Sequence, residues 1–281
     1  MTSAPPIIVA CDLDRTLIYS ANSMALDMAD SDAPPMVVSE VYQGVPLSFM
    51  TATAERMLES LAARTVFVPV TTRTVAQYQR VRLPGPTPGF AITTNGGVIL
   101  LDGQPDTSWG ADIARRSATE CASLAEIERL VAAGDQMRPW ILRVAHAEEL
   151  FCYAIVDREA MPEQYLEDLR RECEARGWSV SVQWRKLYCI PNPVNKAVAI
   201  EEVRRRTGST VVLAAGDSLL DRDMLRQATR AFRPRHGELD DAGYLADNLT
   251  ITTARGIRAG EELLERLCAE AAKQSAGFTR A

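Results

Sequence analysis

The sequence has few of the residues from which several common kinds of site are built. It contains two histidines, His146 and His236, and six scattered cysteines without a Cys-X-X-Cys pair. We therefore expect neither a histidine-rich metal site nor a zinc site. Several cysteines lie inside apolar runs, which favours reduced, buried thiols over disulfides and indicates a cytoplasmic protein.

Long apolar runs and an excess of basic charge are also missing. Every apolar run ends well before the roughly 18 residues that a membrane-spanning helix needs, and the first residues lack the basic segment of a signal peptide. The 31 basic and 37 acidic side chains give a formal net charge of −6, which argues against nucleic acid and membrane surfaces as partners. Small anions stay candidates, because a bound metal ion can reverse the local sign of the charge.

What is present is typical of a globular protein. The chain has 281 residues, of which 47% are hydrophobic and 24% charged, enough for one large domain or two modest ones. The composition does not predict an oligomeric state.

The two ends of the chain alternate between strand and helix patterns. Residues 6–11 form a short apolar run, β-branched at its centre, which predicts a buried parallel strand. The acidic, proline-ended stretch 27–35 is expected to be exposed. The other predicted elements are a helix at 53–63, a strand at 65–70, strands at 90–93 and 97–101 around a tight turn, a helix at 196–206, a strand at 210–214, helices near 221–228 and 259–273, and short edge strands at 232–234 and 248–252.

The middle of the chain has a different order of elements. Its predicted elements are a helix at 111–133, strands at 141–146 and 150–156, a helix at 162–176, and strands at 179–184 and 187–190. This order predicts an α+β module with its own antiparallel sheet, in whose core we place Trp140 and Trp184. The predicted fold class is therefore α/β, with a discontinuous Rossmann-like parallel-sheet core (1–102 and 188–281) and an inserted α+β cap domain (103–187).

Carboxylates follow the first predicted strand directly, in the segment Asp12-Leu13-Asp14-Arg15-Thr16. Side chains at the carboxyl end of a parallel strand face the crevice where ligands bind. Two carboxylates one residue apart, with a hydroxyl close by, suit both Mg²⁺ binding and nucleophilic chemistry. A solvated turn after a strand is the plainer interpretation of this motif taken alone.

Three more polar elements complete a possible phosphate site. Asp217 and Asp221 follow the strand at 210–214, Thr71 follows the strand at 65–70, and Lys196 begins a helix. Taken alone, Asp217 or Thr71 could cap a helix, and Lys196 could be a solvated surface lysine. Separate structural roles explain each residue alone, but they do not readily explain why all these motifs occur in this order in one α/β chain.

These four motifs, in this order, resemble the haloacid dehalogenase-like (HAD) hydrolase superfamily, whose members are mostly Mg²⁺-dependent phosphatases and phosphomutases. Thr71-Thr72-Arg73, Thr93-Thr94-Asn95-Gly96 and an insertion between the threonine and lysine motifs resemble the subgroup with the larger α/β cap. That subgroup includes Cof-type and sucrose-phosphate phosphatases. Arg15 and Thr72 depart from the pattern, since many members have glycine at both places.

The resemblance implies a role for each motif residue. Asp12 would be the nucleophile that forms an aspartyl-phosphate, and Asp14 the general acid and base. Mg²⁺ would be held by the metal-binding residues Asp12, Asp14 (through its main-chain carbonyl), Asp217 and Asp221, the last through water or by orienting the lysine. Thr71, Thr72 and Lys196 would bind the phosphoryl oxygens.

The cap would select the substrate, which the resemblance implies is a small phosphorylated metabolite such as a sugar phosphate. Candidate substrate-binding residues are Asn95, Arg73, Arg143, Arg185 and Lys186. Each of these also has a plainer interpretation as a surface or structural side chain.

Three functions stay open on the sequence. The first is hydrolysis of a phosphate monoester, which the carboxyl group of Asp14 favours over carbon–halogen cleavage because a halide leaves without a proton. The second is a phosphomutase of the same superfamily, and the third is a catalytically silent ligand-binding or regulatory relative.

Overall fold

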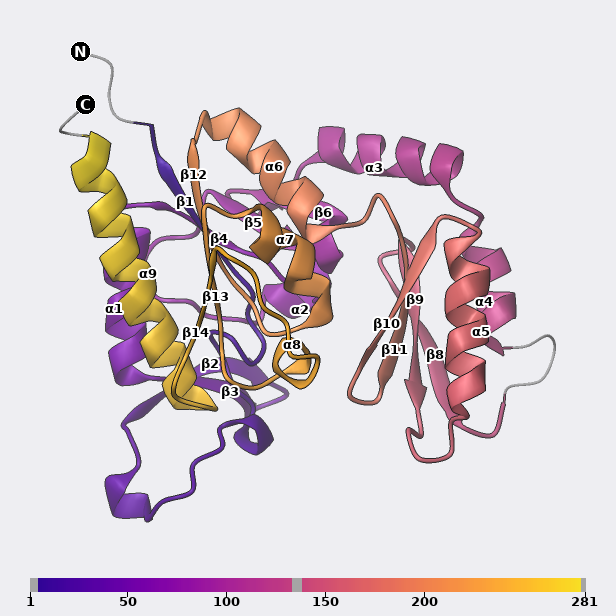
Figure 1. Cartoon of the computed structure of the whole chain (residues 1–281), viewed down its shortest axis with the longest axis horizontal. Coiled ribbons are helices and arrows are strands. Elements are labelled where there is room, and N and C mark those ends of the chain that lie inside the picture. Colours follow the sequence, from indigo (N-terminus) through magenta and orange to yellow (C-terminus); the bar gives the residue numbers. More distant parts are fainter. Residues whose placement is uncertain (1–4, 133–137, 279–281) are drawn as a thin grey trace. The chain divides into compact units, whose positions relative to one another are not determined.

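The computed structural model describes residues 5–132 and 138–278, and its packing divides the chain into two compact units (Figure 1). One unit comprises residues 1–105 and 196–281, and the other residues 106–195. Among the described residues, no helix is long and apolar enough to cross a membrane.

The first unit is built on a parallel sheet with the strand order β14-β13-β12-β1-β4. Its strands are β1 (Ile7–Cys11), β4 (Val66–Pro69), β12 (Val211–Ala215), β13 (Arg230–Arg233) and β14 (Leu249–Ile251). β1 and β12 are buried along their whole length, as expected for strands covered on both faces. The chain proceeds from β1 toward β4 on one side and later returns to β12 on the other. The boundary between β1 and β12 is thus a topological switch point, where side chains at the strand ends border a crevice.

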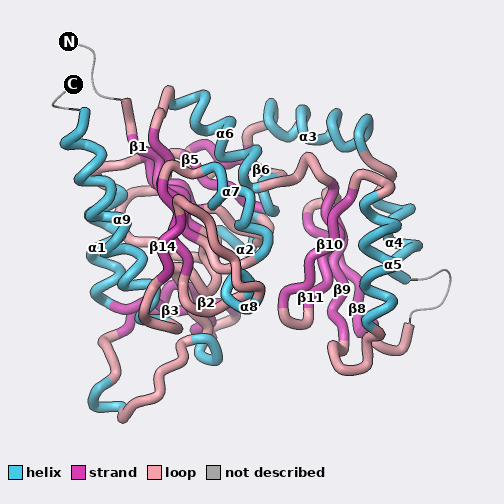
Figure 2. Tube along the Cα trace, viewed as in Figure 1, coloured by secondary structure: helices cyan, strands magenta, loops and turns pink. Residues whose placement is uncertain are grey.

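Helices cover both faces of this sheet, with α1 and α9 on one side and α6 and α7 on the other (Figure 2). The helices of the unit are α1 (Ala52–Ala62), α2 (Val75–Tyr78), α6 (Lys196–Thr207), α7 (Arg222–Gln227), α8 (Glu238–Asp241) and α9 (Ile257–Phe278), with 3₁₀ turns η1 (Ala21–Ser23), η2 (Asp30–Asp32), η3 (Thr94–Gly96) and η4 (Leu219–Asp221). The sequence-predicted alternation of strands and helices is confirmed.

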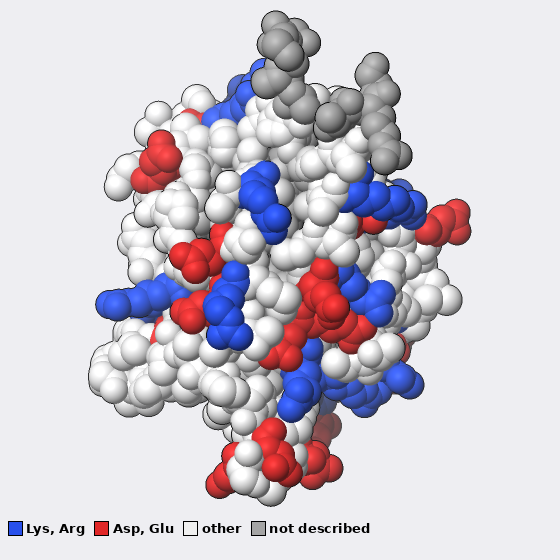
Figure 3. Space-filling model, turned by 90° about the vertical axis from the view of Figure 1, so that its left-hand side faces the viewer, with Lys and Arg blue, Asp and Glu red and all other residues white. Residues whose placement is uncertain are grey.

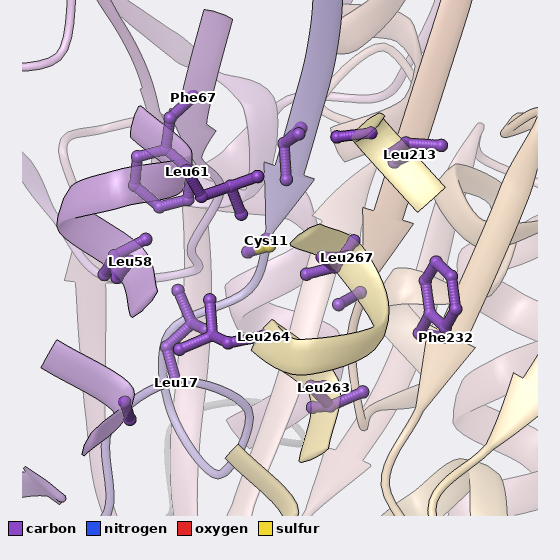
Figure 4. Packing of buried hydrophobic residues seen from close by; sticks show 14 of the residues in the cluster. Cys11, Leu17, Leu58, Leu61, Phe67, Leu213, Phe232, Leu263, Leu264 and Leu267 are labelled. Carbon is purple, nitrogen blue, oxygen red and sulfur yellow. The ribbon is translucent and has the colours of Figure 1, made fainter. Parts of the chain in front are cut away.

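The main apolar core lies between the sheet and the helices α1 and α9 (Figure 4). Thr51 caps the N-terminus of helix α1, and its hydroxyl accepts the N–H of Ala54 over 3.0 Å. It buries Ala54, Leu58 and Leu61, which the helical repeat places on one face. Helix α9 contributes Leu264 and Leu267 to the same cluster. This packing fixes β1 from one side and so holds the residues that follow it.

The segment between β1 and α1 ends in a hairpin that the sequence analysis did not predict. Strands β2 (Met36–Tyr42) and β3 (Val45–Thr51) pair antiparallel. Residues 27–32 are exposed, as expected for the acidic stretch, and acidic side chains gather at the lower tip in Figure 3, where Figure 1 shows this loop. A second small sheet is formed by β5 (Phe90–Thr93), β6 (Val98–Leu101) and β7 (Gln104–Pro105). The first two strands correspond to those predicted at 90–93 and 97–101, and the third was not predicted.

The second unit contains an antiparallel sheet of order β10-β11-β9-β8, with α4 and α5 on one of its faces. Its elements are α3 (Thr107–Glu120), α4 (Leu124–Ala132), β8 (Ile141–Ala147), β9 (Phe151–Val156), α5 (Glu163–Glu174), β10 (Trp178–Gln183) and β11 (Lys186–Pro191). An α/β fold consisting of a parallel-sheet core and an α+β module is confirmed. The exact limits of the two domains, and the assignment of the second as a substrate-selecting cap, stay predictions.

Two sequence expectations for this unit were wrong. The helix predicted at 111–133, whose last residue lies outside the described part, is divided into α3 and α4. At the break, Ala122 donates its N–H to the carbonyl of Arg176 over 2.9 Å and accepts from the indole of Trp178, also over 2.9 Å. These tertiary bonds replace helical ones. Trp184 is 80% exposed, because it lies in the β10–β11 turn with a φ of 55°.

Candidate active site

Carboxylates gather at the carboxyl ends of β1 and β12. Asp12 follows β1 directly and donates its N–H to the carbonyl of Ala215 over 2.9 Å. Asp217 and Asp221 follow β12. Among the described residues, these three aspartates form the one group of three or more histidine, cysteine or acidic side chains whose ligand atoms all lie within 4.8 Å of one another. All three side chains are buried. The sequence-predicted motifs from the two ends of the chain therefore meet.

Lys196, the first residue of α6, lies inside this cluster. Its Nζ donates to Oδ1 of Asp12 over 2.7 Å and to Oδ1 of Asp221 over 2.6 Å. The side chain is 1% exposed, which contradicts the interpretation as a solvated surface lysine. Burial by itself lowers the pKa of Lys196, but the two carboxylates outweigh it and raise the pKa above its usual value. The lysine is therefore a fixed cation.

The cluster holds more negative than positive charge. Burial raises the pKa of Asp12 to about 7, and the charges of Asp221 and Asp14 add to this rise while Lys196 opposes it. Burial, followed by the charges of Asp12 and Asp221, likewise raises the pKa of Asp217 well above its usual value. Lys196, and Arg15 near Asp217, lower these pKa values but do not outweigh the burial and mutual repulsion of the carboxylates, whereas a divalent cation bound by them would.

Asp221 is fixed by its local sequence. Its Oδ2 accepts the N–H of Ser218 over 2.9 Å and the hydroxyl of Ser218 over 2.8 Å, which leaves Oδ1 for Lys196. Gly216 provides the space, since a Cβ at that position would lie 2.5 Å from Cγ of Asp221. The spacing Gly-Asp-X-X-X-Asp thus has a steric reason here.

Thr71 lies at the same edge of the sheet, after β4. Strand β4 pairs parallel with β1, with Pro69 opposite Cys11, and the N–H of Val70 bonds the carbonyl of Cys11 over 2.8 Å. The hydroxyl of Thr71 accepts the N–H of Arg73 over 3.2 Å. Thr72, the next residue, is half-buried.

Arg73 contacts Asp14, although the sequence suggested it as a substrate ligand. Its Nε and Nη2 donate to the two carboxylate oxygens of Asp14, each over 2.7 Å, and its Nη1 donates to Oε2 of Glu40 over 2.8 Å. Burial opposes the charge of the guanidinium, but the bonds to Asp14 and then to Glu40 raise the pKa of Arg73 above its usual value. Arg73 therefore joins two acidic side chains.

The remaining candidate substrate residues are divided between the two units. Asn95 is buried in η3 with a φ of 56°, and its N–H donates to the carbonyl of Thr71 over 2.9 Å. Arg143 is exposed on β8, Arg185 is exposed in the β10–β11 turn, and the Nζ of Lys186 lies 5.6 Å from the centre of the Tyr153 ring. These three belong to the second unit, and their part in substrate binding stays a prediction.

Three residues that sequence reasoning did not assign border the site. Glu40 contacts Arg73, as described. Arg15 has a φ of 61°, and its Nε lies 3.8 Å from Oδ2 of Asp217. His236 donates from Nε2 to the carbonyl of Arg15 over 2.8 Å and accepts the N–H of Gly256 at Nδ1 over 3.1 Å. Burial lowers the pKa of His236, so the ring supports the loop in its neutral form. Of these three residues, only Arg15 was noticeable in the sequence, because many members of the superfamily have glycine at its position.

Comparisons with known proteins agree on the fold. No protein-family model and no curated protein sequence matches the chain. Among solved structures, the sucrose-phosphatase of Synechocystis sp. PCC6803 superposes with a TM-score of 0.64 at 15% identity, over 94% of this chain and 98% of that one. A haloacid dehalogenase-like hydrolase of Bacillus subtilis gives 0.52 at 16% identity (95% and 93% covered). A phosphatase of the same superfamily from Bacteroides thetaiotaomicron gives 0.52 at 15% identity (94% and 96% covered).

Such low identities establish an architecture, and these matches extend over nearly the whole of each chain. The chain therefore has the fold of the haloacid dehalogenase-like phosphatases, as the order of its motifs predicted.

Proposed function

We propose that this chain is a Mg²⁺-dependent phosphatase that hydrolyses the phosphate monoester of a small metabolite through an aspartyl-phosphate on Asp12. The observation that carries the proposal is the buried group of Asp12, Asp217 and Asp221 around Lys196, at the switch point of a parallel sheet. The likeness of the fold to phosphatases supports it.

The donor set fits a hard divalent cation. Mg²⁺ prefers carboxylate and other oxygen ligands. Burial, together with the charges of neighbouring aspartates, raises the pKa values of Asp12 and Asp217, and a bound cation would favour their ionised forms. Asp12 and Asp217 would hold the ion, with Asp221 acting through water or through Lys196, and the main-chain carbonyl of Asp14 as a further ligand. When bound, Mg²⁺ would neutralise charge on the phosphoryl group.

The nucleophile in this proposal is the carboxylate of Asp12. Lys196 holds one of its oxygens and fixes the direction of the group, so that little reorganisation is needed for in-line attack. The attack forms a bond between Asp12 and phosphorus as the bond from phosphorus to the leaving oxygen breaks.

Asp14 would move the protons of both steps. In the first step its carboxyl proton passes to the leaving alcohol oxygen. In the second, the carboxylate takes a proton from the water that attacks phosphorus, and Asp12 is released as a carboxylate. Asp14 is the reachable acid for this task, since half of its side chain is exposed while Asp12, Asp217 and Asp221 are enclosed.

Thr71, Thr72 and Lys196 would bind the phosphoryl oxygens. The hydroxyl of Thr71 lies at the same sheet edge as Asp12, and Lys196 supplies a buried positive charge. Donors fixed in this way stabilise the charge of the transferring group without the cost of reorienting water.

A sugar phosphate is the substrate class we propose. Support comes from the sucrose-phosphatase, whose structure contains sucrose and phosphate, and from the similar trehalose-6-phosphate phosphatase related protein. Asn95 in the core, with Arg143, Arg185 and Lys186 in the second unit, would contact the sugar. Six free cysteines suit a reducing compartment, and we place the enzyme in the cytoplasm.

The test is turnover of p-nitrophenyl phosphate and of a panel of sugar phosphates with Mg²⁺, followed by release of inorganic phosphate. We expect Asp12→Asn to abolish release, because an amide does not attack phosphorus, while the fold stays intact. Asp30→Asn, at an exposed position of η2, is the matched control and should keep full activity. Equal activity of Asp12→Asn and the unmodified chain would refute the proposal.

A further inference from the structure

Glu40 is a buried carboxylate in strand β2, where Ser39 is also buried but most other side chains are exposed. Its side chain is 2% exposed, whereas Val38, Val41 and Tyr42 on the same strand are all exposed. The pairing of β2 with β3 shifts register on both sides of Glu40, which stands opposite Ser48. Such an irregularity re-aims a side chain. Here it turns the carboxylate of Glu40 inward.

Two arginines and a hydroxyl surround this carboxylate. Ser48 donates its hydroxyl to Oε2 over 3.1 Å, and Arg73 donates Nη1 to the same oxygen over 2.8 Å. The Nε of Arg80 lies 3.3 Å from Oε1, close enough for an ion pair but not aligned for a hydrogen bond. The guanidinium of Arg80 also lies over the ring of Tyr42, 4.4 Å from its centre. The buried carboxylate of Glu40 is therefore held in place by a hydroxyl and two guanidinium groups.

Arg73 uses all three of its guanidinium nitrogens between Glu40 and Asp14. Nη1 binds Glu40, while Nε and Nη2 form a planar fork with both oxygens of Asp14. Its main chain is also held, since its N–H donates to the hydroxyl of Thr71 and its carbonyl accepts the N–H of Thr94 over 2.7 Å. The guanidinium thus has a fixed position and plane.

Asp14, by contrast, lies in an exposed turn, with half of its side chain open to solvent. A short side chain in such a place is free to rotate unless a partner holds it. The fork of Arg73 occupies one lone pair on each oxygen of Asp14, and a carboxylate oxygen has a second that can take part in proton transfer. The pairing therefore orients the carboxylate without blocking it.

We propose that Glu40 is a positioning residue, which orients Asp14 through Arg73 for proton transfer to the leaving group. This inference rests on the proposed phosphatase function and adds to it a residue from the β2–β3 hairpin. A purely structural role for Glu40 predicts a different outcome, because loss of stability would lower activity equally for all substrates.

The experiment compares two esters of similar size in the presence of Mg²⁺. p-Nitrophenol leaves readily as an anion, so p-nitrophenyl phosphate needs little proton transfer, whereas benzyl phosphate releases a poor leaving group that needs it. The value of kcat/KM is measured, since it reports the steps up to formation of the aspartyl-phosphate. For Glu40→Gln we expect kcat/KM to fall about 10-fold more for benzyl phosphate than for p-nitrophenyl phosphate, a fraction of what general acid catalysis contributes.

Three further variants define the result. Glu265→Gln, the same change at an exposed site of α9, should alter neither rate. Arg73→Lys keeps the charge but loses the two parallel bonds to Asp14, and its kcat/KM should also fall more for benzyl phosphate than for p-nitrophenyl phosphate. This variant tests the proposal even if Glu40→Gln does not fold. In an Asp14→Asn background, Glu40→Gln should add less than about 2-fold, because both changes act on one group.

The outcomes separate the two proposals. Equal losses for both esters in folded Glu40→Gln and Arg73→Lys would overturn the positioning role while leaving the phosphatase function in place. A wild-type chain inactive on both esters, and on the sugar phosphate panel, would overturn the proposed function itself.

Discussion

Lys196 and Asp12 form a buried ion pair between distant parts of the chain: Nζ of Lys196 and Oδ1 of Asp12 lie 2.7 Å apart although the two residues are 184 positions apart in sequence. The same ammonium group binds Asp221. Helix α6 is thus joined at its first residue to the ends of β1 and β12.

Replacing the lysine should therefore harm stability as well as activity. Lys196→Met removes the charge and keeps the length, leaving Asp12 and Asp221 buried without their partner. We expect the free energy of unfolding without metal to fall by about 3 kcal/mol, as for other broken buried pairs, and phosphate release to fall at least about 100-fold. Urea unfolding and turnover measure both effects. Lys273→Met, at an exposed position of α9, should change neither.

Metal binding should stabilise the protein more at higher pH. The pKa of Asp12, raised by burial from 3.8 to about 7, means that the folded metal-free chain holds a proton that the unfolded chain releases. Its stability therefore decreases as the pH rises between these two values. Mg²⁺ needs the ionised form, so the increase in Tm caused by Mg²⁺ over EDTA should be larger at pH 8 than at pH 5.5. The same increase at both pH values would contradict the proposed metal site.

A methyl group at Gly216 should displace the side chain of Asp221. The Cβ of Gly216→Ala would lie 2.5 Å from Cγ of Asp221, so Asp221 must move and give up its bond to Lys196. We expect activity to fall about 100-fold, the effect of losing one fixed polar group. Gly110→Ala is the matched control: it lies in helix α3, a Cβ there meets nothing within 4 Å, and it should increase stability by about 0.5–1 kcal/mol. Wild-type activity in Gly216→Ala would show that Asp221 is dispensable.

Glu262 should contribute stability that acid removes. Its carboxylate accepts the N–H groups of Thr253 and Ala254 and the guanidinium of Arg266. Burial opposes its charge, but these bonds outweigh it and lower the pKa of Glu262 from 4.5 to about 2. The stabilisation is therefore complete above pH 4.5 and is lost as the pH falls toward 2.

Glu262→Gln should accordingly lower the free energy of unfolding by about 1–2 kcal/mol at pH 7, a value reduced for solvent screening. The difference from wild type should become smaller at pH 3, as measured by urea unfolding. A difference that stays constant over this range would assign the loss to packing rather than to charge.

Parts of the site could be predicted because their signals are local. Asp12 and Asp217 each follow a buried strand, and parallel strands bring their carboxyl ends to one edge, so their meeting follows from the pattern of apolar residues. Lys196 begins a helix after the inserted segment, and the order of the motifs placed it at the same edge. The alternation of strands and helices gave the fold class for the same reason.

Other features depended on contacts between distant segments. The division of the predicted helix 111–133 arises from bonds to Arg176 and Trp178, which no property of the helical segment indicates. Trp184 is hydrophobic enough for a core, but a left-handed turn turns it to solvent. Arg73 was assigned to substrate because the sequence does not show which acidic side chains it meets.

The sequence by itself thus determined the fold class and the identity of the acidic and lysine motifs, because strand burial, helix periodicity and the residues that directly follow a strand are local properties. The tertiary structure decided the partners: that Lys196 joins Asp12 to Asp221, and that Glu40 reaches Asp14 through Arg73. The physical reason is that ion pairs form where folding brings charges together in a shielded place, and for Glu40 that place depends on the register shifts of β2 against β3 on both sides of this residue.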